Sequence, residues 1–121
     1  MFYNVAAGAL IEHGNPVTAM QLCQSGLALA IYMGSLFRQC MVLLTMAWIK
    51  RNAGDFAGAK EDASESQRLA RLAGNVHSEC EALTYEATSW LNLGNYEHCI
   101  SLVDRATYLI DMKVLIGQKP F

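Results

Sequence analysis

The chain has 121 residues, of which 53% are hydrophobic and 17% are charged, and its formal net charge is −2. Such a chain is too apolar to be disordered, and it lacks the basic face that nucleic-acid binders usually carry, so we expect no nucleic-acid partner. The charges are unevenly placed, because Glu12 and Arg38 are the only charged residues between positions 1 and 47.

The termini and cysteines point to an intracellular protein. The N-terminus lacks the basic opening and the cleavage site of a signal peptide, and four cysteines are few for a small disulfide scaffold. The best membrane candidate, residues 26–37, is shorter than the about 20 residues that a span needs. We therefore expect a cytoplasmic location, free thiols and no membrane-spanning helix.

Glycine followed by a polar residue divides the chain into helices. Glycine adopts the left-handed conformation that ends a helix, and Ser, Asn or Asp caps the next one. These pairs begin at Gly14, Gly34, Gly54, Gly74 and Gly94. The expected helices span about residues 1–13, 16–33, 36–53, 56–73, 76–93 and 96–112.

The pattern recurs every 40 residues. Aligning residues 14–53 with 54–93 gives nine identical pairs, Cys40 with Cys80 among them. Connections this short make neighbouring helices antiparallel. The sequence thus predicts an all-α domain over residues 1–113. Its three antiparallel helical hairpins cover about residues 1–33, 36–73 and 76–113, and residues 114–121 form a tail.

Small and aromatic residues at fixed positions of these hairpins resemble the tetratricopeptide repeat (TPR). The matching residues are Ala47, Gly54, Phe56 and Ala59 in the middle hairpin, and Ala87, Gly94, Tyr96, Cys99 and Ala106 in the third. The 40-residue period resembles the long-helix TPR variety of adaptor and signalling proteins, and also the expanded fungal TPR proteins. The resemblance implies a right-handed α-solenoid that serves as a scaffold for protein or peptide partners and has no catalytic activity.

The resemblance also implies that the first helix of each hairpin lines a concave partner-binding groove. The candidate binding residues are Leu44, Trp48, Arg51, Asn52, Thr88 and Asn92. Family members that bind acidic C-terminal peptides have a lysine where Leu44 and Thr84 stand here, and long-helix members have asparagines where Trp48 and Thr88 stand. The ligand codes of the family therefore do not transfer to this chain.

The two tryptophans have different expected roles. Trp90 matches the aromatic residue that packs between the helices of a hairpin, so we assign it to the core. Trp48 is expected to face the groove, where aromatic side chains often carry binding energy. A packing role for Trp48 against the charge-poor first hairpin is left open.

No residue pattern indicates a metal, a cofactor or a catalytic centre. Zinc requires closely spaced ligands, whereas Cys40 and Cys80 are a full repeat apart. His98 and Cys99 are adjacent on a helix and so point about 100° apart, which does not suit a nucleophile and its base. We expect His98 to be a solvated surface residue. The cluster around Glu61, Asp62 and Glu65 is expected to be a solvated face.

Three other functions are kept as alternatives. The apolar ends of the hairpins allow self-association of copies. A helical-bundle enzyme would use Cys99 or a histidine, and peripheral membrane attachment would use the first two helices. The sequence also suggests that the chain is part of a longer array, because hairpins of this kind bury their apolar faces against further hairpins.

Overall fold

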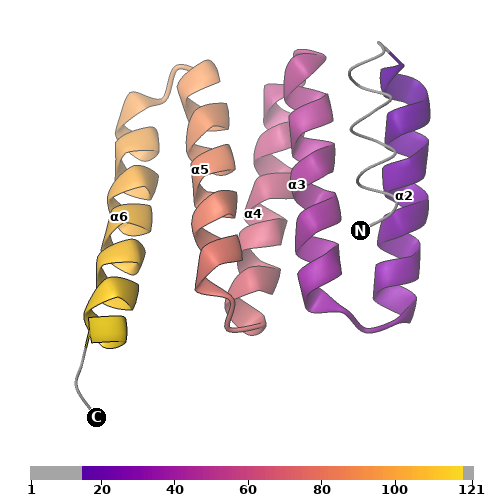
Figure 1. Cartoon of the computed structure of the whole chain (residues 1–121). Helices are drawn as coiled ribbons and strands as arrows, with labels where there is room; N and C mark the ends of the chain where they lie inside the picture. The colour runs from indigo at the N-terminus through magenta and orange to yellow at the C-terminus, as the bar shows by residue number, and fades with distance from the viewer. Residues whose placement is uncertain (1–14, 119–121) are drawn as a thin grey trace.

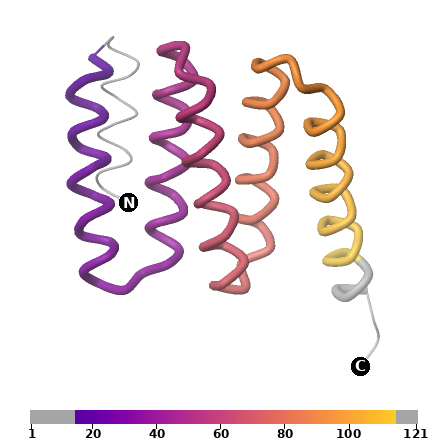
Figure 2. Tube along the Cα trace, turned by 180° about the vertical axis from the view of Figure 1, so that it is seen from behind, coloured from indigo at the N-terminus to yellow at the C-terminus, as the bar shows by residue number. Residues whose placement is uncertain are grey.

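The computed structural model describes residues 15–118, and all of their regular structure is helical (Figure 1). The helices are α2 (Pro16–Tyr32), α3 (Leu36–Asn52), α4 (Phe56–Leu72), α5 (Val76–Asn92) and α6 (Tyr96–Gln118). They follow one another up and down as a stack of antiparallel helices (Figures 1 and 2). The all-α repeat architecture is thereby confirmed, whereas the helix expected over residues 1–13 lies outside the described residues.

The helix boundaries result from the glycine and cap residues identified in the sequence. Each helix is preceded by a polar side chain that accepts a hydrogen bond from a backbone N–H of the first turn, which satisfies one of the otherwise unpaired donors there. The five acceptors are Asn15, Ser35, Asp55, Asn75 and Asn95. Gly34, Gly54, Gly74 and Gly94 all have positive φ between 68° and 87°.

The end of α6 differs from the prediction. The helix continues to Gln118, whereas the sequence pattern suggested an end near residue 112. The earlier helices each stop at a glycine that is followed by Ser, Asn or Asp, whereas the glycine after Met112, Gly117, is followed by glutamine. Part of the expected tail therefore belongs to α6.

Small buried residues let the helices of a hairpin pack closely. Ala47 on α3 and Ala59 on α4 are almost fully buried, and Tyr85 of α5 packs against them. The hydroxyl of Ser66 on α4 donates to the carbonyl oxygen of Cys40 on α3 at 2.9 Å. Small residues of α3 and α4 are thus buried where these two helices meet.

The odd-numbered helices lie on the inner side of the stack. Besides its neighbours along the chain, α3 contacts α5, whereas α4 contacts neither α2 nor α6. Helices on the concave side of a curved stack approach one another more closely than those on the convex side. We therefore call the side formed by α3 and α5 the inner face, and the side formed by α2, α4 and α6 the outer face.

Candidate protein-interaction surface

The six candidate groove residues all belong to the inner helices α3 and α5, but they differ in exposure. Leu44 is only 8% exposed and therefore offers little surface to a partner. Its burial departs from the expectation, because α3 packs against α2, α4 and α5 and so buries more of its circumference than a helix lining an open groove. The other candidates are accessible. Trp48, Arg51 and Thr88 are half-buried, and Asn52 and Asn92 are exposed.

Five of these residues gather at one edge of the stack. Trp48, Arg51 and Asn52 belong to the last turns of α3, and Thr88 and Asn92 to the last turns of α5. The two helices run in the same direction, so their C-terminal ends lie at the same edge, at the top of Figure 1. We call these five residues the inner edge.

The inner edge combines an aromatic surface with free polar groups. Among the described residues, Arg51 has no ion-pair partner, and the side chains of Asn52 and Asn92 form no hydrogen bond. The Thr88 hydroxyl donates to the Thr84 carbonyl oxygen at 2.9 Å, so its hydrogen is used within its own helix. The inner edge thus presents one guanidinium group, two amides and one indole ring.

Trp90 lies between three helices, but in a polar environment and not in the hydrophobic core. Its indole Nε1 donates to Oε2 of Glu86 at 3.1 Å, and its ring centroid is 4.3 Å from that of His98. The ammonium group of Lys60 lies 4.5 Å from the centroid of the Trp90 ring, within the range of a cation–π interaction. His98 is exposed, as expected, and its ring also packs against that of Trp90.

Two buried glutamates continue this polar contact along α5. Glu79 is 3.2 Å from Arg71 of α4 and 3.6 Å from Arg105 of α6. With its amide oriented to satisfy both neighbours, Gln67 donates to Glu86 and accepts from Arg71. We call the whole set the outer seam. It consists of Lys60, Gln67, Arg71, Glu79, Glu86, Trp90, His98 and Arg105.

Three polar residues of the outer seam stand where the preceding repeat has apolar residues. The positions 40 residues before Lys60, Gln67 and Glu86 hold Met20, Leu27 and Met46, which belong to or pack against the main hydrophobic cluster. At these three positions the stack is therefore apolar in the preceding repeat and polar in the following one. Comparison of these positions in the sequence could have indicated the seam.

The acidic cluster on α4 is only partly a solvated face. Glu65 and Arg68 form an exposed pair at 2.6 Å, as expected for that face, and the hydrogen bond from Arg68 lowers the pKa of Glu65. Asp62, by contrast, lies 2.8 Å from the ammonium group of Lys50 on α3 and is largely buried. Burial raises the pKa of Asp62, and Lys50 opposes this shift. The Lys50–Asp62 pair thus joins two helices.

The cysteines of the described residues are free, and Cys99 is the only one that is not buried. Burial raises the pKa of Cys23 to about 11 and also raises the pKa of Cys40 and Cys80. These three thiols are therefore protonated at neutral pH. No group of three or more His, Cys, Asp or Glu residues that could hold a metal ion occurs within residues 15–118.

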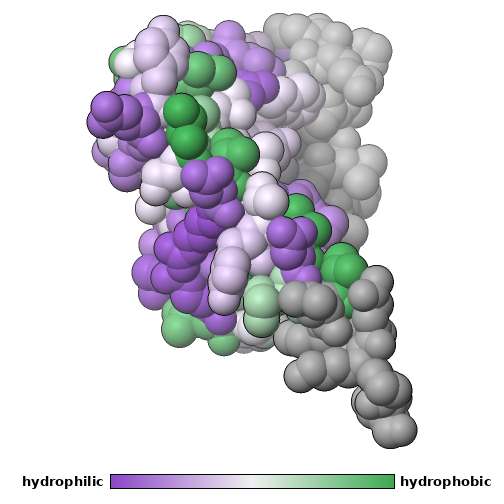
Figure 3. Space-filling view, turned by 90° about the vertical axis from the view of Figure 1, so that its left-hand side faces the viewer, coloured by the Kyte–Doolittle hydropathy of each residue, from purple (hydrophilic) through white to green (hydrophobic). Residues whose placement is uncertain are grey.

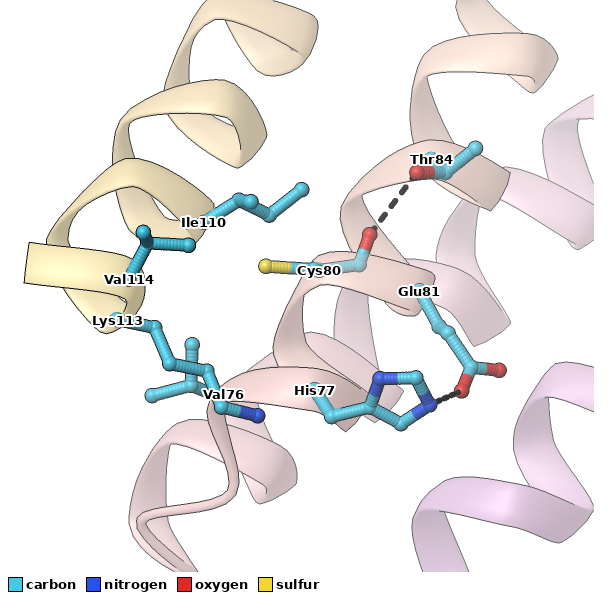
Figure 4. Close-up of a pocket in the computed structure, with 8 residues that line it drawn as sticks. All are labelled: Val76, His77, Cys80, Glu81, Thr84, Ile110, Lys113 and Val114. Carbon is cyan, nitrogen blue, oxygen red and sulfur yellow. Dashed lines mark hydrogen bonds and ion pairs between the residues drawn. The ribbon is translucent and has the colours of Figure 1, made fainter. Parts of the chain in front are cut away.

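The open cavities between neighbouring helices include two that are lined mainly by apolar side chains. One, of about 460 Å³, lies between α2 and α3 beside Met20 and Ile49. The other, of about 330 Å³, lies between α5 and α6, where Cys80 and Ile110 face one another (Figure 4). Neither cavity includes a residue of the inner edge.

Comparisons of the chain with protein-family models, with curated proteins and with solved structures give no match. In the part of the chain that the structure describes, no helix has the length and hydrophobicity needed to cross a membrane.

Proposed function

We propose that this protein is a TPR-like scaffold of the cytoplasm that binds a protein or peptide at its inner edge and performs no catalysis. The observation that carries the proposal is the position of Trp48. Its half-buried indole lies at the edge where Arg51 and Asn52 have no partners within the described residues. Aromatic and arginine side chains are the residues that most often dominate the energy of protein interfaces.

The chemistry of the inner edge favours a segment that presents both an apolar side chain and backbone or carboxylate oxygens. The indole of Trp48 offers an apolar contact, and the Arg51 guanidinium can bind a carboxylate or a carbonyl oxygen. Asn52 and Asn92 occupy equivalent positions one 40-residue repeat apart, so their amides can bond to two points along one extended or helical segment.

A quantitative pull-down with Trp48→Ala tests this proposal. The wild-type chain and the variant are immobilised in equal amounts and compared for recovery of proteins from the source cells. Tyr108→Ala is a matched control, because Tyr108 is an exposed aromatic residue on the outer helix α6. If Trp48 is an anchor worth about 2 kcal/mol, its removal lowers the affinity about 30-fold.

The expected result is loss of specific partners with Trp48→Ala and normal recovery with Tyr108→Ala. Circular dichroism melts of all three proteins separate binding from folding. Equal recovery with a lowered melting temperature would assign Trp48 to packing and overturn the proposal. Equal recovery with unchanged melting would also overturn it.

A further inference from the structure

One face of α6 carries an exposed apolar stripe that no described residue covers. Its residues are spaced alternately by four and three positions, the spacing that lines one side of a helix in helix pairs. The α6 stripe consists of Tyr96, Ile100, Val103, Thr107, Ile110 and Val114. All six are exposed, the five apolar ones by 48–63%. Figure 3 views this end of the molecule, where green apolar groups lie among purple hydrophilic ones.

The preceding repeat shows what covers this face inside the stack. Ala63 and Ala70 of α4 correspond to Val103 and Ile110 and are fully buried. Ala63 packs in a cluster with Tyr85 of α5, whereas Ala70 belongs to the cluster formed with α3. Lys60 and Gln67 of α4 correspond to Ile100 and Thr107 of the stripe and contact Trp90 and Glu86 of α5. Helix α5 in turn also contacts α3. The equivalent place beside α6 is the α5–α6 cavity, bordered by Ile110 and Val114 (Figure 4). A further helix antiparallel to α6 therefore fits there.

The charges beside the stripe and the cavity decide the chemistry of that helix. Lys113 borders the cavity (Figure 4), but three acidic residues lie beside the stripe, so the net charge there is negative. Glu97, Asp104 and Asp111 follow one another at intervals of seven residues, next to the stripe, and none of them forms an ion pair with another described residue. We call them the acidic row. Asp111 corresponds to Arg71 of α4, which pairs with Glu79 of the covering helix α5. The charge at this position is positive on α4 and negative on α6. A helix that covers α6 therefore needs a basic residue where α5 has Glu79.

A second copy of the chain fits this face poorly. Two α6 helices packed antiparallel through the same stripe would place their acidic rows against each other, and like charges across a helix pair are unfavourable. The occupant that satisfies both the stripe and the row is amphipathic and basic.

We propose that the α6 stripe and the α5–α6 cavity bind a basic amphipathic helix of a partner protein, which extends the stack at the position of a next odd-numbered helix. This surface is separate from the inner edge, so it can be occupied together with that edge. Contact with the α6 stripe provides the apolar area, and contact with the acidic row selects the charge.

A pair of synthetic peptides tests the proposal on the intact chain. Both have the sequence of α5, Val76–Asn92, with Cys80→Ser to prevent oxidation and with a hydrocarbon link between positions 77 and 81 to hold the helix. The basic peptide also carries Glu79→Arg and Glu86→Arg, whereas the acidic peptide keeps both glutamates. We expect the basic peptide to bind saturably in fluorescence anisotropy, about tenfold more tightly than the acidic one.

Variants of the chain locate the binding site and its charge requirement. The Asp104→Lys, Asp111→Lys double variant should reverse the preference, so that the acidic peptide binds more tightly. Ile110→Ser should weaken both peptides, whereas Tyr108→Ser, which changes an exposed residue outside the stripe, should not. Trp48→Ala should leave the peptide affinity unchanged, so a failed peptide test and a failed inner-edge test are distinguishable.

Three results would overturn the proposal. The first is equal affinity for the two peptides, and the second is no binding of either one by the folded chain. The third is a dimer in sedimentation that Val103→Lys converts to a monomer, because the occupant of the stripe would then be a second copy.

Discussion

The two glycines near the junction of α3 and α4 differ in backbone conformation, so their replacement has different consequences. Gly54 has a φ of +87°, where a side chain is strained although nothing lies within 4 Å of an added Cβ. Gly58 is helical, and an added Cβ there meets only the end of the flexible Asp55 side chain. The equivalent positions of the other caps hold residues with side chains, such as Thr18 and Ser78, which are compatible with the same hydrogen bond.

Replacement of these two glycines should therefore have opposite effects. Gly54→Ala should lower the free energy of unfolding by about 1 kcal/mol because of the left-handed backbone. Gly58→Ala should raise it by about 0.5–1 kcal/mol, because alanine favours the helix. Urea unfolding followed by circular dichroism measures both. A loss of stability in Gly58→Ala would show that the Asp55 cap cannot adjust.

The cysteines should differ in reactivity because of their burial. Thiolates are the reactive form, and burial raises the pKa of Cys23 from 9.0 to about 11. We expect iodoacetamide at pH 8 to modify the half-buried Cys99 first, with Cys23, Cys40 and Cys80 reacting only after unfolding. Peptide mapping by mass spectrometry measures the order, and early modification of Cys23 would contradict the structure.

The raised pKa of Cys23 also predicts that the free energy of unfolding depends on pH. The folded protein holds the Cys23 proton more tightly than the unfolded chain does, so this contribution is complete below pH 9.0 and is lost as the pH rises towards 11. The free energy of unfolding should fall over that range by less in Cys23→Ala than in the wild type. Parallel slopes for the two proteins would show that Cys23 is not the group responsible.

Buried polar side chains of the outer seam join α4 and α6 to α5 by bonding to one another. Glu86 is 7% exposed and accepts hydrogen bonds from Trp90 and Gln67. Removal of one member leaves the others buried without partners, which costs more than the bond itself contributes.

Glu86→Ala should therefore destabilise the chain by about 2 kcal/mol, whereas Glu81→Ala, at an exposed position of the same helix, should change stability by less than about 0.5 kcal/mol. The double variant Gln67→Leu, Glu86→Met copies the apolar Leu27 and Met46 of the preceding repeat and should recover part of the loss. Urea unfolding compares these variants. If the double variant loses as much stability as Gln67→Leu and Glu86→Met lose together when made singly, positions 67 and 86 are not equivalent to the apolar positions 27 and 46.

The helix boundaries were predictable from sequence because their causes are local. Gly34 and Ser35, for example, end one helix and cap the next within a few residues, so the pattern can be read without the fold. The outer seam was not predictable in this way, because Glu79 meets Arg71 of α4 and Arg105 of α6 only after three helices have packed. The burial of Leu44 was not predictable for a similar reason, since it depends on the several helices that surround α3.

The stack as a whole is held together mainly by contacts between helices adjacent in the chain, with the α3–α5 contact as the exception in the described part. Stability in such arrays is close to a sum of local terms, so an end can open without the middle. Among the described helices, α6 contacts only α5 and has the exposed stripe.

Native-state hydrogen exchange should show directly that α6 opens more easily than the middle of the stack. Amides of α6 should exchange through local opening at a lower free energy than amides of α4, which is covered on both sides by α3 and α5. Addition of the basic peptide should slow the exchange of α6, whereas the acidic peptide should have a much smaller effect. Equal protection of α4 and α6 in the free chain would contradict a stack with an open face.

The central claim is that the inner edge binds a protein partner, and hydrogen exchange of the chain with and without a partner recovered by the wild type tests it most directly. The proposal predicts slower exchange at residues 48–52 and 88–92, with no slowing in the middle of the outer helix α4. Slower exchange confined to α4 or α6, or no change at residues 48–52, would contradict it.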